Sequence, residues 1–363
     1  MNPWFPEKDK DLSSLYIKLL QKSAGLGSSH NKITRRRIAD VMRRISCYYM
    51  LMNLGLHATP GDIESADRKE FSDDPDRAAL RKWCYAFIHT FKMIDVRLLS
   101  EPELNVSSKN YLQWIHTLFF RKVPPEYLRI SGREVEKRVT LIPGKMPSGV
   151  DNSHIETMFR DFEDQYSSSE LAGERLAEAA LVSHARLFSL FPVRTEAEIM
   201  ACFYSHSYFR LAGLDSFGLW SLPKTIFHNR DKYTGLLKLA FKTGEYAGSV
   251  ARLKDFVIFM GEITEGEMNY MEGIINQENF IENIRGYVNL RSRNMIPHEK
   301  PLREEAKYII TETMLRGKIT RGEAKQVSGL GERTARSLLS TLLDEGLLIS
   351  ENHKAPVQFA IPS

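Results

Sequence analysis

The fold of this protein is decided by the stretch Leu181-Val182-Ser183-His184-Ala185-Arg186-Leu187-Phe188-Ser189-Leu190-Phe191-Pro192. Its apolar residues recur at helical spacing, which predicts a helix that continues to about residue 190. His184 shares a face of this helix with Leu181, Leu187 and Phe188. A histidine in such a place is either a hydrogen-bonded structural residue or a relocated general base, and the apolar neighbours favour the structural role.

The same 3.6-residue periodicity extends over most of the chain on both sides of this stretch. Apolar residues at helical spacing run through residues 12–20, 38–52, 83–98, 196–212, 230–242, 251–275 and 278–290. One segment differs, because residues 137–142 alternate polar and apolar side chains next to proline- and glycine-containing turns, which predicts a small β-flap. Residues 1–290 are therefore expected to form one all-α domain that carries this flap.

Length and composition limit the class of protein. The 363 residues predict two or three cores, and 42% hydrophobic with 26% charged residues is typical of a folded globular protein. No apolar run is long enough to span a membrane and the first residues lack the apolar core of a signal peptide, so we expect a cytoplasmic protein. Cys47, Cys84 and Cys202 match neither a disulfide framework nor a zinc spacing, and no cofactor or metal ion is predicted.

A polar segment at residues 291–300 predicts a linker to a second unit at residues 301–363. Within that unit Thr320 and Glu323 have the spacing of a capping box at the start of a helix. The elements expected there are a helix over 302–315, a short helix from 320, a helix over 332–345, and strands over 347–350 and 357–361. Helix, helix, turn, helix and hairpin is the order of a winged helix-turn-helix.

The helix expected over 332–345 is the recognition helix of such a motif, and its apolar residues are assigned to the inward face. The polar residues left over are expected to reach base edges and phosphates: Arg333, Thr334, Arg336, Ser337 and Ser340. Lys354 lies at the tip of the expected wing, where a phosphate contact is predicted. However, residues 301–352 carry eight Lys or Arg and eight acids, and phosphate contacts supply much of the affinity for DNA. A winged helix used for packing or dimerisation is therefore the alternative.

A basic cluster lies near the N-terminus. Six positive charges fall within thirteen residues, opposed only by Asp40: Lys32, Arg35, Arg36, Arg37, Arg43 and Arg44. A helix there places Arg36 and Arg43 away from the apolar stripe, where they form a basic edge. That edge is either a solvated helix face or a second contact with the DNA.

The stretch 181–192 resembles the helix and loop entry of the Fic family, whose members transfer nucleotidyl or related groups from a nucleotide to a protein hydroxyl. Further segments resemble parts of that family in the same order along the chain: 58–63, 219–222, 228–237, 256–275 and 354–357. The resemblance covers most of residues 40–360 and implies an all-α Fic-like fold followed by a winged helix.

The family's signature, His-x-Phe-x-(Asp/Glu)-Gly-Asn-Gly-Arg-x-x-Arg, is replaced at residues 191–202. The catalytic histidine aligns with Phe191 and the metal-binding acid with Thr195, which removes the general base and the magnesium carboxylate. The other signature positions align with Val193, Glu196, Ala197, Glu198, Ile199 and Cys202. Glutamates in place of the phosphate-binding glycines would repel a polyphosphate. The family's inhibitory glutamate aligns with Leu54.

Together these features predict a catalytically inactive Fic-like protein, a pseudoenzyme, that acts as a DNA-binding transcriptional regulator. The expected partners are double-stranded DNA and a second copy of the chain, with the helical domain serving dimerisation or sensing. The alternative is a non-standard Fic enzyme that transfers a nucleotidyl or phosphate group to a protein hydroxyl.

Overall fold

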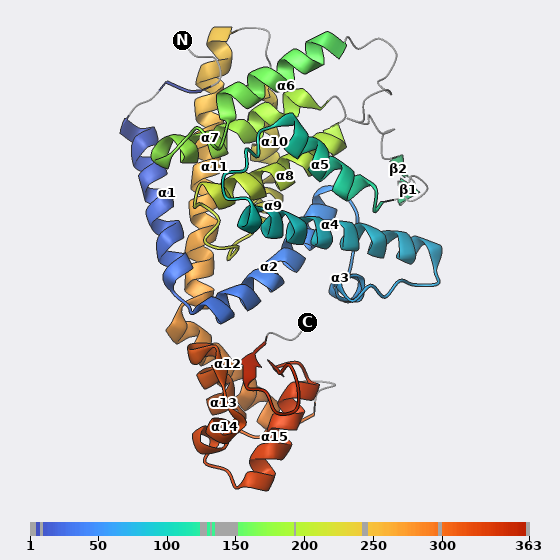
Figure 1. Cartoon of the computed structure of the whole chain (residues 1–363), viewed down its shortest axis with the longest axis vertical. Helices are drawn as coiled ribbons and strands as arrows, with labels where there is room; N and C mark the ends of the chain where they lie inside the picture. Colours follow the sequence, from blue (N-terminus) through green and yellow to red (C-terminus); the bar gives the residue numbers. More distant parts are fainter. Residues whose placement is uncertain are drawn as a thin grey trace. The chain divides into compact units, whose positions relative to one another are not determined.

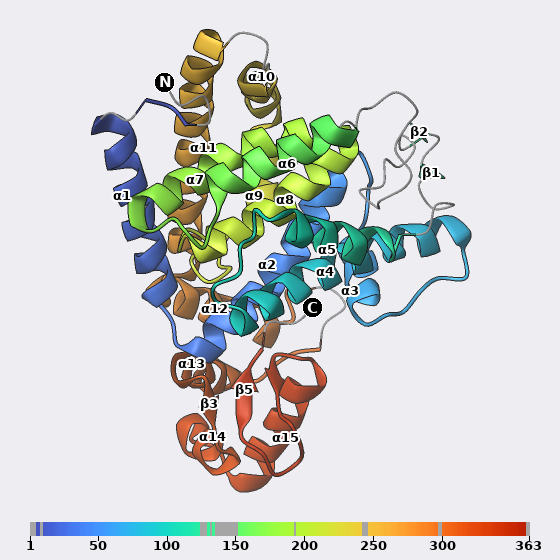
Figure 2. The same cartoon turned by 45° about the horizontal axis from the view of Figure 1, so that its top comes forward.

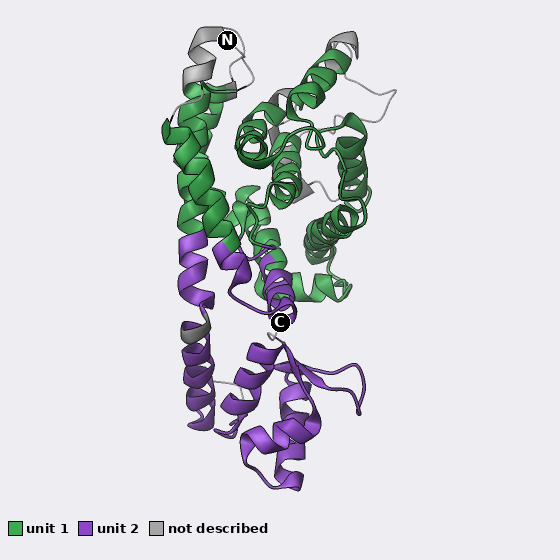
Figure 3. Ribbon diagram, turned by 60° about the vertical axis from the view of Figure 1, so that its left-hand side comes forward, with its two compact units in different colours: residues 1–24, 43–216, 221–267 green, residues 25–42, 217–220, 268–363 purple. Residues whose placement is uncertain are grey.

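The computed structural model describes residues 5–7, 10–123, 129–130, 133–134, 152–191, 194–241, 246–296 and 300–360. The chain divides into two compact units (Figure 3). Unit 1 comprises residues 1–24, 43–216 and 221–267, and unit 2 comprises residues 25–42, 217–220 and 268–363. The domain boundary that we expect at residues 291–300 stays a prediction. The two compact units do not test it, because a compact unit does not have to fold on its own as a domain does. The β-flap expected at 137–142 lies outside the described residues.

The described part of the chain is mostly helical, as the periodicity predicts (Figure 1). The helices before residue 190 are α1 (Lys10–Ser28), α2 (Lys32–Asn53), α3 (Pro60–Asp67), α4 (Pro75–Ser100), α5 (Lys109–Phe120), α6 (Asn152–Tyr166), α7 (Gly173–Leu187) and the short 3-10 helix η2 (Phe188–Leu190). The next four are α8 (Arg194–Leu211), α9 (Leu222–His228), α10 (Arg230–Phe241) and α11 (Tyr246–Ile275). Among the described residues, no helix combines the length and apolar character needed to cross a membrane.

Local signals place several of the helix starts. Thr59 and Asp62 form a reciprocal capping box at α3, with Pro60 at the first helical position. Asp74 caps α4 and Ser108 caps α5, each by accepting a hydrogen bond from a backbone N–H of the first turn. These short side chains satisfy N–H groups that have no partner inside the helix, and so they fix where each helix begins.

Unit 1 is organised around α8. The helices α6, α7 and α8 lie side by side, and α8 also packs against α4 and α5 (Figure 2). Phe87, Phe91, Phe119 and Phe203 meet at this junction, with ring centroids 4.7–5.7 Å apart. All four rings are buried. The only strands described in this unit are β1 (Arg129–Ile130) and β2 (Arg133–Glu134), which pair antiparallel.

Unit 2 contains the element order expected at the C-terminus. Its elements are α12 (Gln277–Ser292), α13 (Ala306–Arg316), β3 (Lys318–Ile319), α14 (Arg321–Ser328), α15 (Glu332–Asp344), β4 (Leu348–Ile349) and β5 (Val357–Phe359). The strands form one antiparallel sheet in the order β3-β5-β4. Strand β3 was not predicted, because two residues are too short for an alternating pattern to show.

The core of unit 2 explains which face of α15 points inward. Leu338, Leu339 and Leu342 are buried together with side chains from α12, α13 and the sheet. The capping box of α14 is present as predicted, with Thr320 and Glu323 bonded to each other's backbone N–H groups. The remaining polar positions of α15 are consequently left outside the core.

The start of α2 is fixed to the end of α13 within unit 2. Asn31 accepts hydrogen bonds from the backbone N–H groups at the start of α2, and its amide donates to the carbonyls of Met314 and Leu315. Gly317 follows α13 with φ +80°, and a Cβ there would lie 2.8 Å from the Asn31 side-chain oxygen. One asparagine therefore caps two helix ends, and the tight fit requires glycine opposite it.

Candidate functional site

Three residues that the resemblance aligns with the signature contact other side chains of unit 1: Phe191, Glu196 and Glu198. Phe191 is buried, and its ring lies edge-on to Phe159 with centroids 6.5 Å apart. A phenyl ring has no atom that accepts a proton from an attacking hydroxyl. Val193 lies outside the described residues.

Glu196 and Glu198, the two glutamates that the sequence resemblance aligns with glycines of the signature, each have a partner. Glu196 accepts a hydrogen bond of 2.6 Å from Nε2 of His116, and both side chains are about nine-tenths or more buried. Its second oxygen, Oε2, is buried with no hydrogen-bond partner. Glu198 accepts bonds of 3.1–3.2 Å from the Arg230 guanidinium, which also donates to Asn53. Both carboxylates are therefore engaged with other residues of unit 1.

His184 has a basic imidazole and Cys202 a nucleophilic thiol, and both side chains are buried in unit 1. His184 is fully buried, with Nδ1 2.7 Å from the Ser205 hydroxyl and Nε2 2.8 Å from the Tyr233 hydroxyl, as expected of a structural histidine. Burial lowers the pKa of His184 to about 3, so the ring is neutral near pH 7. Burial, together with the charge of Glu198, raises the pKa of the Cys202 thiol to about 12, which keeps the thiol protonated.

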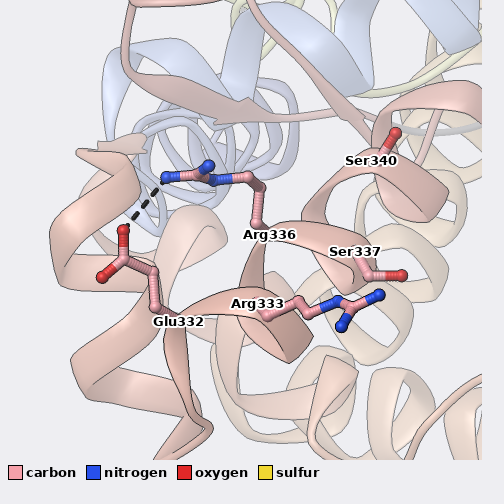
Figure 4. A pocket seen from close by; sticks show the side chains of 5 residues that line it. All are labelled: Glu332, Arg333, Arg336, Ser337 and Ser340. Atoms are coloured by element: carbon pink, nitrogen blue, oxygen red, sulfur yellow. Dashed lines mark hydrogen bonds and ion pairs between the residues drawn. The ribbon is translucent and has the colours of Figure 1, made fainter.

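The second candidate site is the outward face of α15 in unit 2. An open groove of about 550 Å³ is lined by Glu332, Arg333, Arg336, Ser337 and Ser340 (Figure 4). All five residues are exposed. Four of them are among the five residues predicted on the recognition helix, and Glu332 is the addition.

A second groove, of about 380 Å³, adjoins the first. Its lining consists of Pro301, Leu302, Arg303, Arg333, Thr334, Ser337, Leu338 and Thr341. Arg333 and Ser337 line both grooves, so the two form one continuous polar surface along α15. Thr334 belongs to this surface, which therefore unites all five predicted residues of the helix. Arg303 was missed by the sequence analysis, because it precedes α13 and no periodic pattern relates it to α15.

The charges of this surface are arranged unevenly. Among the described residues, Arg303 and Arg333 make no ion pair and no side-chain hydrogen bond. Arg336 is held by Glu332, with the guanidinium and the carboxylate 3.0 Å apart. Glu332 also lies 3.6 Å from the ammonium group of Lys325. Two arginines are therefore available to a ligand, while the one acid of the groove is already neutralised.

Residues 301–352 have equal numbers of basic and acidic side chains, but this balance does not describe the charge of the surface along α15. Glu345 is paired with the buried Arg291, which lies outside that range, and Glu323 is paired with Arg316 as it caps α14. Unit 2 as a whole has 17 Lys and Arg against 13 Asp and Glu, so it carries the entire net charge of +4 of the chain.

Lys354 is exposed in the turn between β4 and β5. Asn352 shapes this turn, because its side-chain oxygen accepts hydrogen bonds of 2.9 Å from the backbone N–H groups of Lys354 and Ala355. The Ser350 hydroxyl donates to carbonyls of the same turn. The hairpin thus presents the Lys354 ammonium at its tip.

The predicted N-terminal basic edge is divided between the two units. Arg36 belongs to unit 2 and is exposed, whereas Arg43 belongs to unit 1 and forms an ion pair of 3.2 Å with Asp95. Burial raises the pKa of Asp95, but the charges of His206 and Arg43 outweigh it and hold this pKa below its usual value. Arg43 is therefore engaged inside unit 1.

Comparison with known proteins finds similarity to solved structures. No protein-family model and no curated protein matches the chain. The solved structure of a Fic family protein from Desulfovibrio desulfuricans G20 is similar to it over 99% of each chain, with 12% sequence identity and a TM-score of 0.48.

Proposed function

We propose that this protein is a DNA-binding transcriptional regulator in which residues 301–363 form a winged helix-turn-helix. The observation that carries the proposal is the continuous polar surface along α15, which has two uncommitted arginines, Arg303 and Arg333. Helix α15 is the recognition helix, and the hairpin of β4 and β5 is the wing. Double-stranded DNA is the ligand.

The order and orientation of the elements support this assignment. Helices α13, α14 and α15 precede an antiparallel hairpin, which is the order of the motif. Leucines fix one face of α15 in the core, while its opposite face carries charged and hydroxyl side chains. A major groove admits one α-helix, and the first residues of a recognition helix reach the base edges.

The chemistry of the exposed side chains supports DNA over a protein or small-molecule ligand. Guanidinium groups and serine hydroxyls donate to phosphate oxygens and to guanine, and Lys354 supplies a further phosphate contact at the wing. Both grooves are open to solvent, whereas sites for small molecules are enclosed.

A homodimer is part of the proposal. One α15 helix presents few cations, so a single copy gains little affinity from counterion release. A second copy that binds a neighbouring half-site would multiply the contacts through the higher effective concentration of the linked site. Unit 1 would then serve dimerisation or sensing.

The loss of Fic chemistry is also proposed. It is supported by Phe191 in place of the base and by the pairs Glu196–His116 and Glu198–Arg230 in place of a phosphate site. Each glutamate would have to leave its partner before a polyphosphate could enter.

The test is recovery of genomic DNA fragments by the intact protein, starting with fragments that include its own promoter. We expect a small set of fragments to be enriched by the wild type and lost with Arg333→Ala. Lys318→Gln is the matched control, since Lys318 is exposed in unit 2 but lines neither groove. Enrichment that is equal for the wild type and Arg333→Ala would reject the assignment to α15.

A further inference from the structure

The groove of α15 combines a limited set of hydrogen-bonding groups. The described residues that line it supply two guanidinium forks, two serine hydroxyls and one carboxylate, and none of them is Asn or Gln (Figure 4). In the major groove guanine offers two acceptors, O6 and N7, and cytosine offers the N4 amino group as a donor. Adenine is read by a side-chain amide, which offers a donor and an acceptor together. The groove therefore matches the edges of a G·C pair.

Arg333 is the side chain that fits guanine. It is exposed, it makes no ion pair with any described residue, and it extends toward Ser337 along the helix (Figure 4). Two parallel N–H donors of one guanidinium match O6 and N7 of guanine, a geometry that a lysine ammonium cannot reproduce. Arg333 is the second residue of α15. It therefore lies close to the N-terminal end of the helix, whose first residues contact base edges in the major groove of DNA.

The carboxylate of Glu332 is negatively charged, and the phosphates of DNA repel a negative charge. Here Arg336 lies 3.0 Å and Lys325 3.6 Å from its carboxylate oxygens. These two cations compensate the negative charge while leaving lone pairs on the carboxylate free to accept further hydrogen bonds. The cytosine N4 amino group is the base donor that Glu and Asp recognise.

We propose that this groove is specific for a G·C-containing site, with Arg333 reading guanine and Glu332 reading cytosine. The inference rests on the proposed DNA binding and adds the bases that are read. Ser337 and Ser340 tolerate any base, since a hydroxyl both donates and accepts. Base preference is thereby concentrated in two adjacent residues at the start of α15.

The experiment selects binding sites from a library of random-sequence duplexes with the intact protein. The variants are Arg333→Lys, Glu332→Gln and the control Lys318→Gln, each first checked for an unchanged thermal unfolding profile. Arg333→Lys keeps the charge but loses the fork, and Glu332→Gln keeps the shape but gains the amide that reads adenine. Each variant therefore changes the hydrogen-bonding pattern of its side chain, and the measured base preference reports that change.

The wild type is expected to enrich sites with guanine and cytosine at fixed positions. Arg333→Lys should reduce the preference for guanine at one position by about 5- to 150-fold. Glu332→Gln should replace the cytosine preference at another position by adenine, and the control should leave all preferences intact. Enriched sites without G·C pairs, or variants that bind every site more weakly with unchanged preferences, would overturn the base assignment but not DNA binding. If the wild type retains no duplex even at low salt, the proposed function itself fails.

Discussion

At the scale of single residues, Glu196 and Glu198 at the start of α8 are each held by a partner within unit 1. Glu196 and His116 form the more buried of these pairs, and Oε2 of Glu196 has no other partner. The removal of one member of such a pair leaves an uncompensated polar group in the interior. The pair therefore stabilises the packing of α5 against α8 only while both members are present.

His116→Ala is expected to lower the free energy of unfolding by about 3 kcal/mol, because it leaves the Glu196 carboxylate buried without its donor. Chemical denaturation of the intact protein measures this change. The double variant His116→Ala/Glu196→Ala serves as the control and should recover part of the loss. A single variant as stable as the wild type would mean that the pair is solvated and does not hold α5 and α8 together.

His184 predicts a pH dependence with a definite sign. Its pKa in the folded state, about 3, lies below the value of about 6.5 in the unfolded chain, so the unfolded state takes up the proton first as the pH falls. The stabilisation that this neutral ring provides is therefore complete above about pH 6.5 and is lost progressively toward about pH 3.

Between pH 7 and pH 5 this loss amounts to about 2 kcal/mol of unfolding free energy. His184→Gln cannot be protonated but keeps a hydrogen-bonding side chain between Ser205 and Tyr233. Denaturation of both proteins at the two pH values should show a smaller decrease in the variant. An equal decrease in both would assign the pH dependence to other groups.

At the scale of elements, the junction of α13 and β3 depends on one glycine. Gly317 and Gly329 both have positive φ, but a Cβ at Gly329 would meet nothing within 4 Å, whereas one at Gly317 would press on Asn31 and Ile33. Alanine at Gly329 incurs the left-handed conformational cost of about 1 kcal/mol, and alanine at Gly317 incurs a larger cost, because its ψ of −34° lies outside the left-handed region. Only Gly317→Ala adds a steric clash.

Thermal unfolding is therefore expected to show a lower midpoint for Gly317→Ala than for Gly329→Ala. The difference between the two midpoints combines the contact with Asn31 and the less favourable backbone conformation of Gly317, which act in the same direction. Equal midpoints would mean that neither the backbone conformation nor the fit against Asn31 restricts the residue at this position.

The elements also show how far sequence patterns reach. Helix periodicity and the Thr320 capping box are local, and the structure has the cap and most helices where these patterns predict them. The helix predicted from residue 302 begins instead at Ala306, and the helix predicted to about residue 190 ends at Leu187, before a short 3-10 helix. Strand β3 pairs with β5, nearly forty residues away, and the pairing leaves no local pattern. The same limit applies to the candidate site. The spacing of the leucines predicts which face of α15 is exposed. The position of Arg303 in the second groove and the ion pair of Arg43 with Asp95 depend on tertiary packing, which the sequence pattern does not show.

At the scale of the whole molecule, unit 1 is predicted to have no transferase activity. The intact protein is incubated with labelled ATP, UTP, GTP or CDP-choline and magnesium, and incorporated label is measured. No self-labelling is expected, because Phe191 cannot act as a base and the carboxylates of Glu196 and Glu198 repel phosphate. Label that persists in Phe191→Ala but disappears in His184→Gln would establish a relocated base and contradict the proposal.

The central claim is that the intact protein binds duplex DNA through α15 and the wing. Its most direct test is the salt dependence of binding to a fluorescent random-sequence duplex, measured by anisotropy for the wild type, Arg333→Ala, Lys354→Ala and Arg36→Ala. We predict a linear fall of log K with log salt in the wild type, and a slope smaller by about one unit in Lys354→Ala, which loses one phosphate contact. Arg333→Ala should bind more weakly than the wild type. If Arg333→Ala and Lys354→Ala bind like the wild type while Arg36→Ala abolishes binding, DNA contacts the start of α2 instead, and the claim is contradicted.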